Sequence, residues 1–353
     1  MTRRRALAAG AACAVLLASC QGTPAPGPST GAGASSGDGA ASSTAPASGA
    51  SSPTGFSNPV VDTNFPDPQV LDTGSDYLAI ATNGNGMNVQ TMTSPDMVQW
   101  TQGVDALPRL ASWSSPGKVW APEITKWPDG TWRLFYTTRA PDPQWQCISV
   151  ATATRAEGPY TDASTRPLVC EVSEGGSIDQ SPFVDSNGRA WLYWKNDGNA
   201  IGADTWIKAQ PLAADGLSVT GRPSRLMHQD QPWEGHLLEA PAVVELDGVF
   251  HMFYSGNDYG SPDYAVGHAV STSPAGPFRK DPEPVLVSNE VAAGPGHCQL
   301  LEVDGKWWMV YHAWQPHAVG DEATGRQMWL SRVTFTGRKA TVEPPTVEHE
   351  ELP

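Results

Sequence analysis

Five ionisable residues recur along this chain at nearly constant spacing, and each stands at the start of a short apolar segment. They are Asp67, Glu123, Asp179, Glu239 and His297. The intervals are 56, 56, 60 and 58 residues (123−67, 179−123, 239−179 and 297−239). A repeat of this length is the signature of a fold built from copies of one supersecondary unit. Equivalent residues of a circular repeat face the same place, so we expect these five side chains to converge.

Each copy of the repeat also contains the signature of an antiparallel hairpin. A turn with glycine follows the apolar segment, and a strand rich in aromatic and aliphatic residues follows the turn. The turns are Thr73-Gly74, Asp129-Gly130, Asn187-Gly188, Asp247-Gly248 and Asp304-Gly305. Asp-Gly and Asn-Gly between apolar runs are strong hairpin signals. The sequence therefore predicts antiparallel strands throughout the repeats.

Units of roughly 55–60 residues with three or four antiparallel strands are typical of propeller blades. Five units fill residues 56–353, so we predict an all-β fold, a single five-bladed β-propeller. A β-sandwich is the alternative, but it does not explain five ionisable residues in phase. The first strand of each propeller blade lines the central channel. The five residues should therefore ring one mouth of that channel.

The first 55 residues differ from the rest of the chain. Three arginines at 3–5 precede an apolar run over 6–18 that is too short to span a bilayer as a mature helix. The run ends in Leu17-Ala18-Ser19-Cys20, which resembles the lipobox of bacterial lipoproteins. This resemblance implies that residues 1–19 are a signal peptide and that Cys20 is lipidated. An ordinary signal peptide cut nearby is the alternative.

Residues 20–55 follow this signal and are rich in Gly, Ala, Ser, Pro and Thr, with the single charge of Asp38. Such a segment has almost nothing to bury and is expected to be a disordered tether. We therefore expect an exported protein, either a lipoprotein on the outer face of the cytoplasmic membrane or a secreted one. Its contact with a membrane would be through the lipid anchor alone.

The formal net charge of −15 bears on the partners of the protein. It argues against nucleic acid, because binding to phosphates depends on Lys and Arg. It is compatible with a neutral ligand rich in hydroxyl groups. We expect a monomer.

Three cysteines lie outside the signal segment and the proposed anchor. Export makes a disulfide permissible, and we pair Cys147 with Cys170 because both lie within one repeat unit. Cys298 is then expected to be buried and inert. A nucleophilic Cys298 beside His297 is the alternative, but neighbours in a strand point to opposite faces.

Crowded carboxylates raise the pKa of at least one of their number, which is a frequent property of functional sites. Three uses fit such a ring. Acid/base hydrolysis of a glycosidic bond needs one protonated and one ionised carboxyl group. A hard cation such as calcium takes carboxylate oxygens. An acidic funnel that only binds a neutral sugar or peptide is the third.

Five motifs in order give the chain a resemblance to glycoside hydrolase family 43. They are Phe65-Pro66-Asp67-Pro68, Trp120-Ala121-Pro122-Glu123, Ser177-Ile178-Asp179-Gln180-Ser181-Pro182-Phe183, Glu239-Ala240-Pro241 and Gly294-Pro295-Gly296-His297. The resemblance runs from about residue 58 to the C-terminus, and the family is a five-bladed propeller that hydrolyses with inversion. It implies an enzyme in which Asp67 is the general base, Glu239 the general acid, and Asp179 the carboxylate that orients the acid and raises its pKa.

The resemblance also implies residues that bind the substrate. Trp120 and Glu123 would shape the sugar subsite, and Arg326 would touch the substrate from the last repeat. His297 resembles the family's channel histidine, which in some members helps hold calcium. No cofactor is expected to be required, and a calcium ion in the channel is an optional one.

The substrate expected from this resemblance is a polysaccharide or oligosaccharide from plants that contains arabinose or xylose. We favour an α-L-arabinofuranosidase or arabinanase, with a β-xylosidase as the alternative; some family members act on galactans. Fructan hydrolysis is disfavoured because the Asn-Asp-Pro-Asn, Arg-Asp-Pro and Glu-Cys motifs of the related fructan enzymes are missing. A non-catalytic propeller that binds sugar is the remaining alternative.

Overall fold

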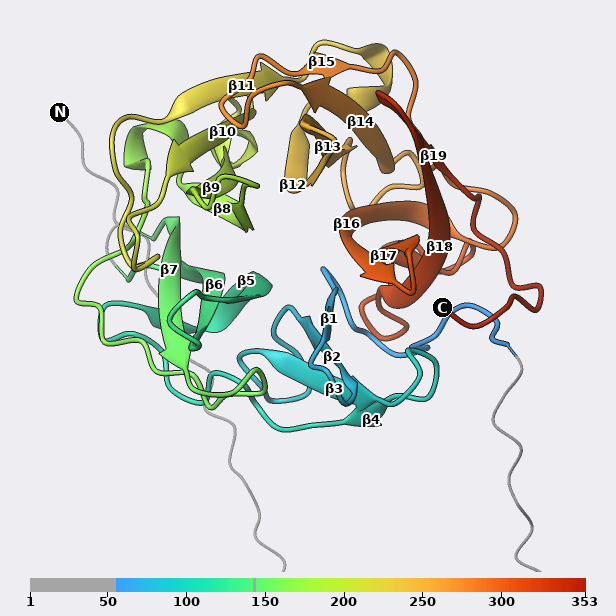
Figure 1. Cartoon of the computed structure of the whole chain (residues 1–353), viewed down its shortest axis with the longest axis horizontal. Coiled ribbons are helices and arrows are strands. Elements are labelled where there is room, and N and C mark those ends of the chain that lie inside the picture. The colour runs from blue at the N-terminus through green and yellow to red at the C-terminus, as the bar shows by residue number, and fades with distance from the viewer. Residues whose placement is uncertain (1–54, 142–143) are drawn as a thin grey trace, which may run out of the picture. The chain divides into compact units, whose positions relative to one another are not determined.

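A computed structural model describes residues 55–141 and 144–353. In Figure 1 five antiparallel sheets stand around a common centre, and the chain passes through them in order. The predicted all-β, five-bladed propeller is therefore confirmed. The proposed signal peptide, Cys20 and the tether up to residue 54 lie outside the described residues.

Each blade is a meander of consecutive strands. Blade I contains β1 (Gln69–Asp72), β2 (Tyr77–Ala81), β3 (Gln90–Ser94) and β4 (Thr101–Gln102). Blade II contains β5 (Ser115–Lys126), β6 (Trp132–Arg139) and β7 (Gln146–Ala153), and blade III contains β8 (Ser177–Val184), β9 (Ala190–Asn196), β10 (Trp206–Pro211) and β11 (Ser224–His228). Blade IV contains β12 (Leu238–Leu246), β13 (Val249–Gly256), β14 (Ala265–Ser271) and β15 (Arg279–Lys280), and blade V contains β16 (Ala293–Val303), β17 (Lys306–Trp314), β18 (Gln327–Thr336) and β19 (Lys339–Val342).

The hairpins form where the Asp-Gly and Asn-Gly turns predicted them. The first two strands of blade IV, for example, pair from Leu246 opposite Val249 across Asp247-Gly248. Both turn residues have positive φ, at 50° and 76°. This pairing of conformations is the one that a two-residue hairpin favours, and Asn, Asp and Gly adopt it at least cost.

The core lies between blades, in five clusters of buried side chains. Each cluster joins two neighbouring blades, such as Phe135 of β6 with Leu192 and Trp194 of β9 between blades II and III. The equivalent clusters lie between blades I and II, III and IV, IV and V, and V and I. Burial of apolar area at all five interfaces closes the ring and holds the inner strands around the channel.

The segment that precedes β1 fastens the first blade to the last. Phe56 forms an isolated antiparallel bridge with Glu350, and Val61 forms one with Met328. The Asn58 side chain accepts from Leu330 N at 2.8 Å and donates to Leu330 O at 2.9 Å. Figure 1 shows this blue segment beside the red strands of blade V.

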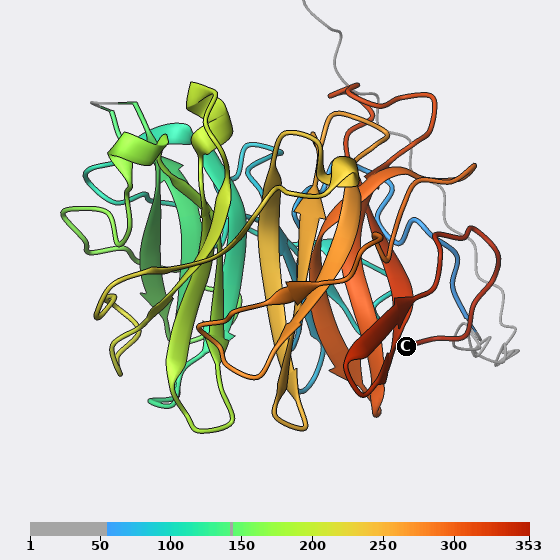
Figure 2. The ribbon, with the colours of Figure 1, turned by 90° about the horizontal axis from the view of Figure 1, so that it is seen from above.

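Three short 3₁₀ segments are the helical elements among the described residues: η1 (Val172–Glu174), η2 (Gly198–Ile201) and η3 (Pro232–Glu234). Among these helices, none has the length or apolar character to cross a membrane. Figure 2 shows the strands running between two faces of the ring, with the loops gathered at those faces.

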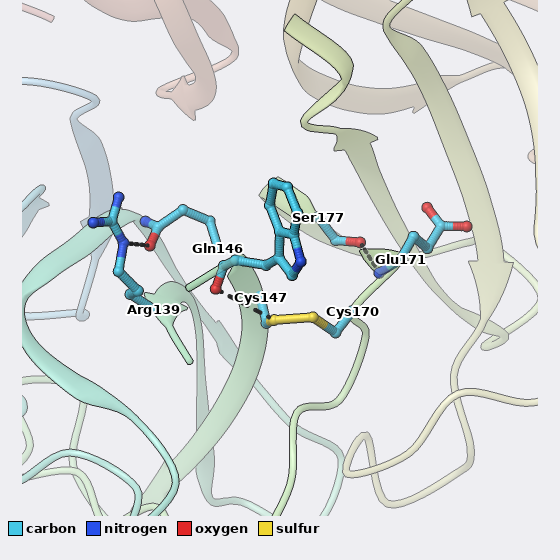
Figure 3. Close-up of a disulfide and its surroundings, with 7 residues drawn as sticks. Arg139, Gln146, Cys147, Cys170, Glu171 and Ser177 are labelled. Atoms are coloured by element: carbon cyan, nitrogen blue, oxygen red, sulfur yellow. Dashed lines mark hydrogen bonds between the residues drawn. A yellow bond between two sulfur atoms is a disulfide. The ribbon is translucent and has the colours of Figure 1, made fainter. Parts of the chain in front are cut away.

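A disulfide joins Cys147 of β7 to Cys170, as Figure 3 shows. It fastens the segment that leads from blade II into β8. The next residue, Glu171, donates its N–H to Ser177 Oγ at 3.1 Å and accepts from Trp194 Nε1 at 3.1 Å. The segment is thus tied at the entrance of the strand that carries Asp179. Cys298 is buried and carries a free thiol, as expected.

Candidate active site

A cavity of about 440 Å³ lies at one mouth of the channel and has walls from all five blades. Six residues singled out from the sequence line it: Asp67, Trp120, Asp179, Glu239, His297 and Arg326. Asp179 and Glu239 lie in inner strands β8 and β12, and Asp67 stands two residues before β1. The predicted convergence of these groups is therefore present in the structure.

A repeated break in the inner strands positions these side chains. At one equivalent position of each blade the backbone is left-handed, with φ between 46° and 55°, and the residues there are Asp67, Ala121, Asp179, Ala240 and His297. The pairing of β5, β8, β12 and β16 with their neighbours shifts register at this residue. Such bulges re-aim side chains and are common beside functional sites. They turn three ionisable side chains at this position toward the cavity.

Glu123 does not share this position. The structural repeat runs 67, 121, 179, 240 and 297, so Glu239 stands one residue before its bulge and Glu123 two residues after. Two residues along a strand correspond to about 6.6 Å. Glu123 is absent from the cavity wall; its carboxyl group accepts from Ser181 Oγ at 3.2 Å and Gln299 Nε2 at 2.5 Å. The structure therefore places Glu123 outside the cavity wall, between Ser181 of blade III and Gln299 of blade V.

The burial of Asp67 is offset by a set of donors and cations. Arg326 Nη1 lies 2.7 Å from Asp67 Oδ1, and the Nδ1 atoms of His297 and His312 lie 3.5 and 3.3 Å from the same oxygen. Burial acts to raise the pKa of Asp67, but Arg326 and the two imidazoles hold it well below its usual range. Asp67 is therefore an anion at neutral pH, as a general base must be.

Asp179 and Glu239 are adjacent carboxyl groups whose pKa values shift in opposite directions. Burial and the adjacent Glu239 carboxylate raise the pKa of Asp179 to about 7. Burial acts in the same direction on Glu239, but Lys195 overcomes it and holds the pKa of Glu239 below its ordinary value. Lys195 Nζ lies 2.8 Å from Glu239 Oε2. Near neutrality this arrangement therefore favours a shared proton on Asp179 over one on Glu239.

Tyr264 donates a hydrogen bond to the second carboxyl oxygen of Glu239. Its hydroxyl group donates to Glu239 Oε1 at 2.8 Å, and its ring stacks at 5.8 Å on His312. A Cβ atom on Gly296 would lie 2.0 Å from Tyr264 Cε1, so only glycine leaves room for this ring. This close approach gives a physical reason for Gly296 in the Gly294-Pro295-Gly296-His297 motif.

Two aromatic residues stand on the cavity wall. The half-buried Trp120 has Lys118 Nζ 5.9 Å from its ring centroid. Tyr259, 46% exposed, has the Arg326 guanidinium 4.7 Å from its ring centroid. Arg326 is therefore held between the Tyr259 ring and the Asp67 carboxylate. Flat rings beside polar groups suit a sugar, which presents C–H groups on one face and hydroxyl groups at its edge.

Calcium does not fit the surroundings of His297. Calcium takes six to eight oxygen ligands, whereas among the described residues Asp67 is the one carboxylate within ion-pair distance of His297, and it already pairs with Arg326. Across the described ranges, no group of three or more His, Cys, Asp or Glu side chains is arranged to hold a metal.

Several residues of the site were not singled out from the sequence, including Lys195, Asp197, Tyr264, Thr82 and His312. Lys195 carried the best available signal, because it directly follows the aromatic run Trp191–Trp194, where a charged residue is unexpected. Thr82 donates to Asp67 Oδ2, and nothing in the local sequence distinguishes it from a surface threonine. Tyr264 and His312 lie in or beside buried strands, where aromatic residues are common.

A five-bladed propeller with an ionised carboxylate and a proton-sharing carboxyl pair in one cavity has the layout of a glycoside hydrolase. Comparison with known proteins agrees. Residues 56–338 match the family model for glycosyl hydrolases family 43, and the chain belongs to that family. It is a glycoside hydrolase of an inverting family.

Individual relatives support the same placement. The chain is 26% identical over 268 residues to the beta-D-galactofuranosidase xynD of Aspergillus niger, covering 72% of this chain and 75% of that protein. It is 23% identical over 280 residues to the probable arabinan endo-1,5-alpha-L-arabinosidase C of Aspergillus oryzae, covering 73% and 85%. Its structure is similar to that of a thermostable family-43 glycoside hydrolase, with a TM-score of 0.77 and 28% identity over 84% of this chain and 99% of that one.

Proposed function

We propose that this protein hydrolyses furanosides, with α-L-arabinofuranosides as the leading substrates and inversion at the anomeric carbon. One observation carries the proposal: Asp67, held as an anion, shares a cavity with a carboxyl pair that binds one proton. An inverting glycosidase needs such an asymmetry between its base and its acid. A propeller that only binds sugar has no use for it.

The proposed mechanism assigns one role to each carboxyl group. Asp67 takes a proton from a water molecule, whose oxygen attacks the anomeric carbon. Glu239 gives a proton to the leaving oxygen as the glycosidic bond breaks. Asp179 sets the pKa of Glu239, either by its negative charge or by sharing a proton with it. The reason is that two adjacent carboxyl groups do not both ionise readily. Arg326 of blade V and Trp120 of blade II hold the sugar from two sides of the cavity wall.

A β-D-galactofuranoside is a second candidate substrate, favoured by the similarity to the beta-D-galactofuranosidase xynD. α-L-Arabinofuranose and β-D-galactofuranose have the same configuration from C1 to C4. They differ in the exocyclic group, which is longer by one hydroxymethylene unit in the galactofuranoside. A pocket that accepts one ring therefore discriminates against the other only through the space and donors around that group. A β-xyloside remains the alternative with a six-membered ring.

The proposed location is the cell surface. It is supported by Arg3–Arg5, the apolar run over 6–18 and the lipobox-like Leu17-Ala18-Ser19-Cys20. Labelling with a radioactive or alkynyl fatty acid, compared with a Cys20→Ser variant, tests it. Label that persists in Cys20→Ser would contradict lipidation at this residue.

The test of substrate and roles is a small panel with matched variants. Purified protein is assayed on the 4-nitrophenyl glycosides of α-L-arabinofuranose, β-D-galactofuranose and β-D-xylopyranose, and on linear arabinan. We expect release from a furanoside, reduced at least about 100-fold in Asp67→Asn, as expected for loss of a general base. Release from the xyloside alone would contradict the furanoside proposal, and no release from any substrate would favour a sugar-binding propeller.

A further inference from the structure

Lys195 has two anionic partners in the cavity. Its Nζ atom lies 2.8 Å from Glu239 Oε2 and 4.0 Å from Asp197 Oδ1. The Lys195 side chain is fully buried, whereas the two carboxylates are each about a tenth exposed, on the cavity wall. A lysine ammonium group is a point charge on a flexible stem with three donors. Exchange of one partner for the other needs movement of only the tip of the side chain.

The arrangement in the structure does not suit Glu239 as an acid. Both of its oxygens accept hydrogen bonds, Oε2 from Lys195 and Oε1 from Tyr264. A carboxyl group that accepts from a lysine at 2.8 Å is held as a carboxylate. The proposed reaction requires the opposite, because Glu239 must carry the proton that the leaving oxygen receives.

We propose that Lys195 is a positioning residue that leaves Glu239 for Asp197 when a glycoside occupies the cavity, and that this exchange transfers the shared proton from Asp179 to Glu239. The inference rests on the proposed roles of Asp179 and Glu239. The exchange allows Glu239 to carry the proton only when a substrate is bound.

The charges around Glu239 favour such an exchange. Ionisable groups face it from four blades: Asp67 from blade I, Asp179, Lys195 and Asp197 from blade III, Tyr264 from blade IV and His297 from blade V. Lys195 is the one lysine among them, and burial alone would lower its pKa. Glu239, Asp179 and Asp197 together outweigh burial and raise the pKa of Lys195. Lys195 therefore stays charged on either partner.

The protons balance through one turnover. The pair holds one proton before and after the exchange, first on Asp179 and then on Glu239. Glu239 gives it to the leaving oxygen, and Asp67 takes one from the attacking water. Asp67 then releases its proton to solvent, the pair takes one up, and Lys195 returns to Glu239.

Substrates with different leaving groups distinguish the proposed role of Lys195 from a purely structural one. A 4-nitrophenolate departs without protonation, whereas an alkoxide needs the acid. Asp197→Asn removes the second partner, so Lys195 stays on Glu239. We expect kcat for the alkyl glycoside of the preferred sugar to fall at least about tenfold, and kcat for its 4-nitrophenyl glycoside to fall less than about threefold.

A suppressor variant sharpens the test. In Lys195→Met/Asp197→Asn the retained lysine is gone, so kcat for the alkyl glycoside should recover at least about fivefold relative to Asp197→Asn. Asp204→Asn is the matched control, because it makes the same change of charge on an exposed residue of the same blade. Equal losses on both glycosides, or a double variant no better than Asp197→Asn, would overturn the inference.

Two further results keep the test decisive. If wild type hydrolyses neither glycoside, the proposed function fails; if it hydrolyses both and the losses are equal, only the role of Lys195 fails. Should Asp197→Asn not fold, a crystal structure of Asp67→Asn with a bound oligosaccharide answers the same question. Lys195 should then lie within hydrogen-bonding distance of Asp197, and its continued contact with Glu239 would contradict the exchange.

Discussion

Arg326 Nη1 lies 2.7 Å from Asp67 Oδ1, which joins the last blade to the first at the point where the reaction is proposed to begin. The two residues are 259 positions apart in the chain. Closure of the ring is what brings them together, so the state of the base depends on the last blade being in place.

Replacement of Arg326 should therefore change the pH dependence of the enzyme as well as its affinity. Burial raises the pKa of Asp67, and Arg326 is the strongest of the groups that oppose it. In Arg326→Met we expect the acid limb of kcat/KM to move upward by about 1–3 pH units, because Asp67 is protonated more readily. Arg225→Met, which removes an exposed arginine from blade III, is the control. An acid limb that does not move would contradict the pairing.

Glu123 should behave as a neutral channel residue. Burial raises its pKa well above the ordinary value, against the hydrogen bonds from Ser181 and Gln299. Glu123→Gln should therefore change kcat less than about twofold and stability by less than about 1 kcal/mol at pH 7. Glu123→Ala leaves buried polar partners unsatisfied and should cost about 1–3 kcal/mol. A large rise in KM in Glu123→Gln would instead support the sugar-binding role expected from the sequence.

Loss of the disulfide should destabilise the propeller and leave the chemistry intact. Cys147 and Cys170 are 23 residues apart, and closing a loop of this length contributes about 3 kcal/mol by the chain-entropy estimate. We expect Cys147→Ser/Cys170→Ser to lower the free energy of unfolding by about this amount in denaturant titrations. Cys298→Ser leaves the disulfide in place and serves as the control. Equal midpoints with and without reductant in wild type would contradict the estimate.

A buried histidine pair should make stability fall on acidification. His251 Nδ1 lies 3.0 Å from His268 Nε2, and burial together with His268 lowers the pKa of His251 to about 4. The unfolded chain, with an ordinary value near 6.5, then binds more protons between pH 6.5 and 4, so stability decreases as the pH falls through this window and levels off below it. His251 alone should account for about 2 kcal/mol at pH 5.

His251→Gln retains a group that can bond to His268 and that does not titrate. Its free energy of unfolding should decline less between pH 7 and pH 5 than that of wild type. The exposed His317 provides the matched control in His317→Gln. Parallel curves for wild type and His251→Gln would show that His251 is not a source of the acid sensitivity.

The sequence was a good guide to the blades and to part of the site. Glycine turns and strand composition are local properties, so the hairpins and the five-fold repeat could be predicted. Asp67, Asp179 and His297 stand at the equivalent left-handed position of their repeats, which is why their spacing was informative. Glu123 has nearly the same spacing but lies two residues beyond its bulge, and spacing alone does not register that offset.

The proton's position could not be predicted, because it depends on contacts between blades. Lys195 reaches Glu239 from blade III to blade IV, a contact that no local pattern encodes. The family resemblance implies Glu239 as the proton donor and Asp179 as the carboxylate that raises its pKa. In the structure Lys195 beside Glu239 lowers the pKa of Glu239, and burial with the adjacent Glu239 raises the pKa of Asp179. The only sequence feature that pointed to this contact was a charged residue, Lys195, directly after an aromatic run.

The most direct test of the account is the configuration of the first sugar released. Hydrolysis of the preferred 4-nitrophenyl furanoside is followed by proton NMR from the first minutes, before the product mutarotates. We expect the anomer opposite in configuration to the substrate to appear first, β-L-arabinofuranose from an α-L-arabinofuranoside, because Asp67 activates water for a single displacement. First appearance of the anomer with the substrate's own configuration would mean a covalent intermediate and would contradict the role assigned to Asp67.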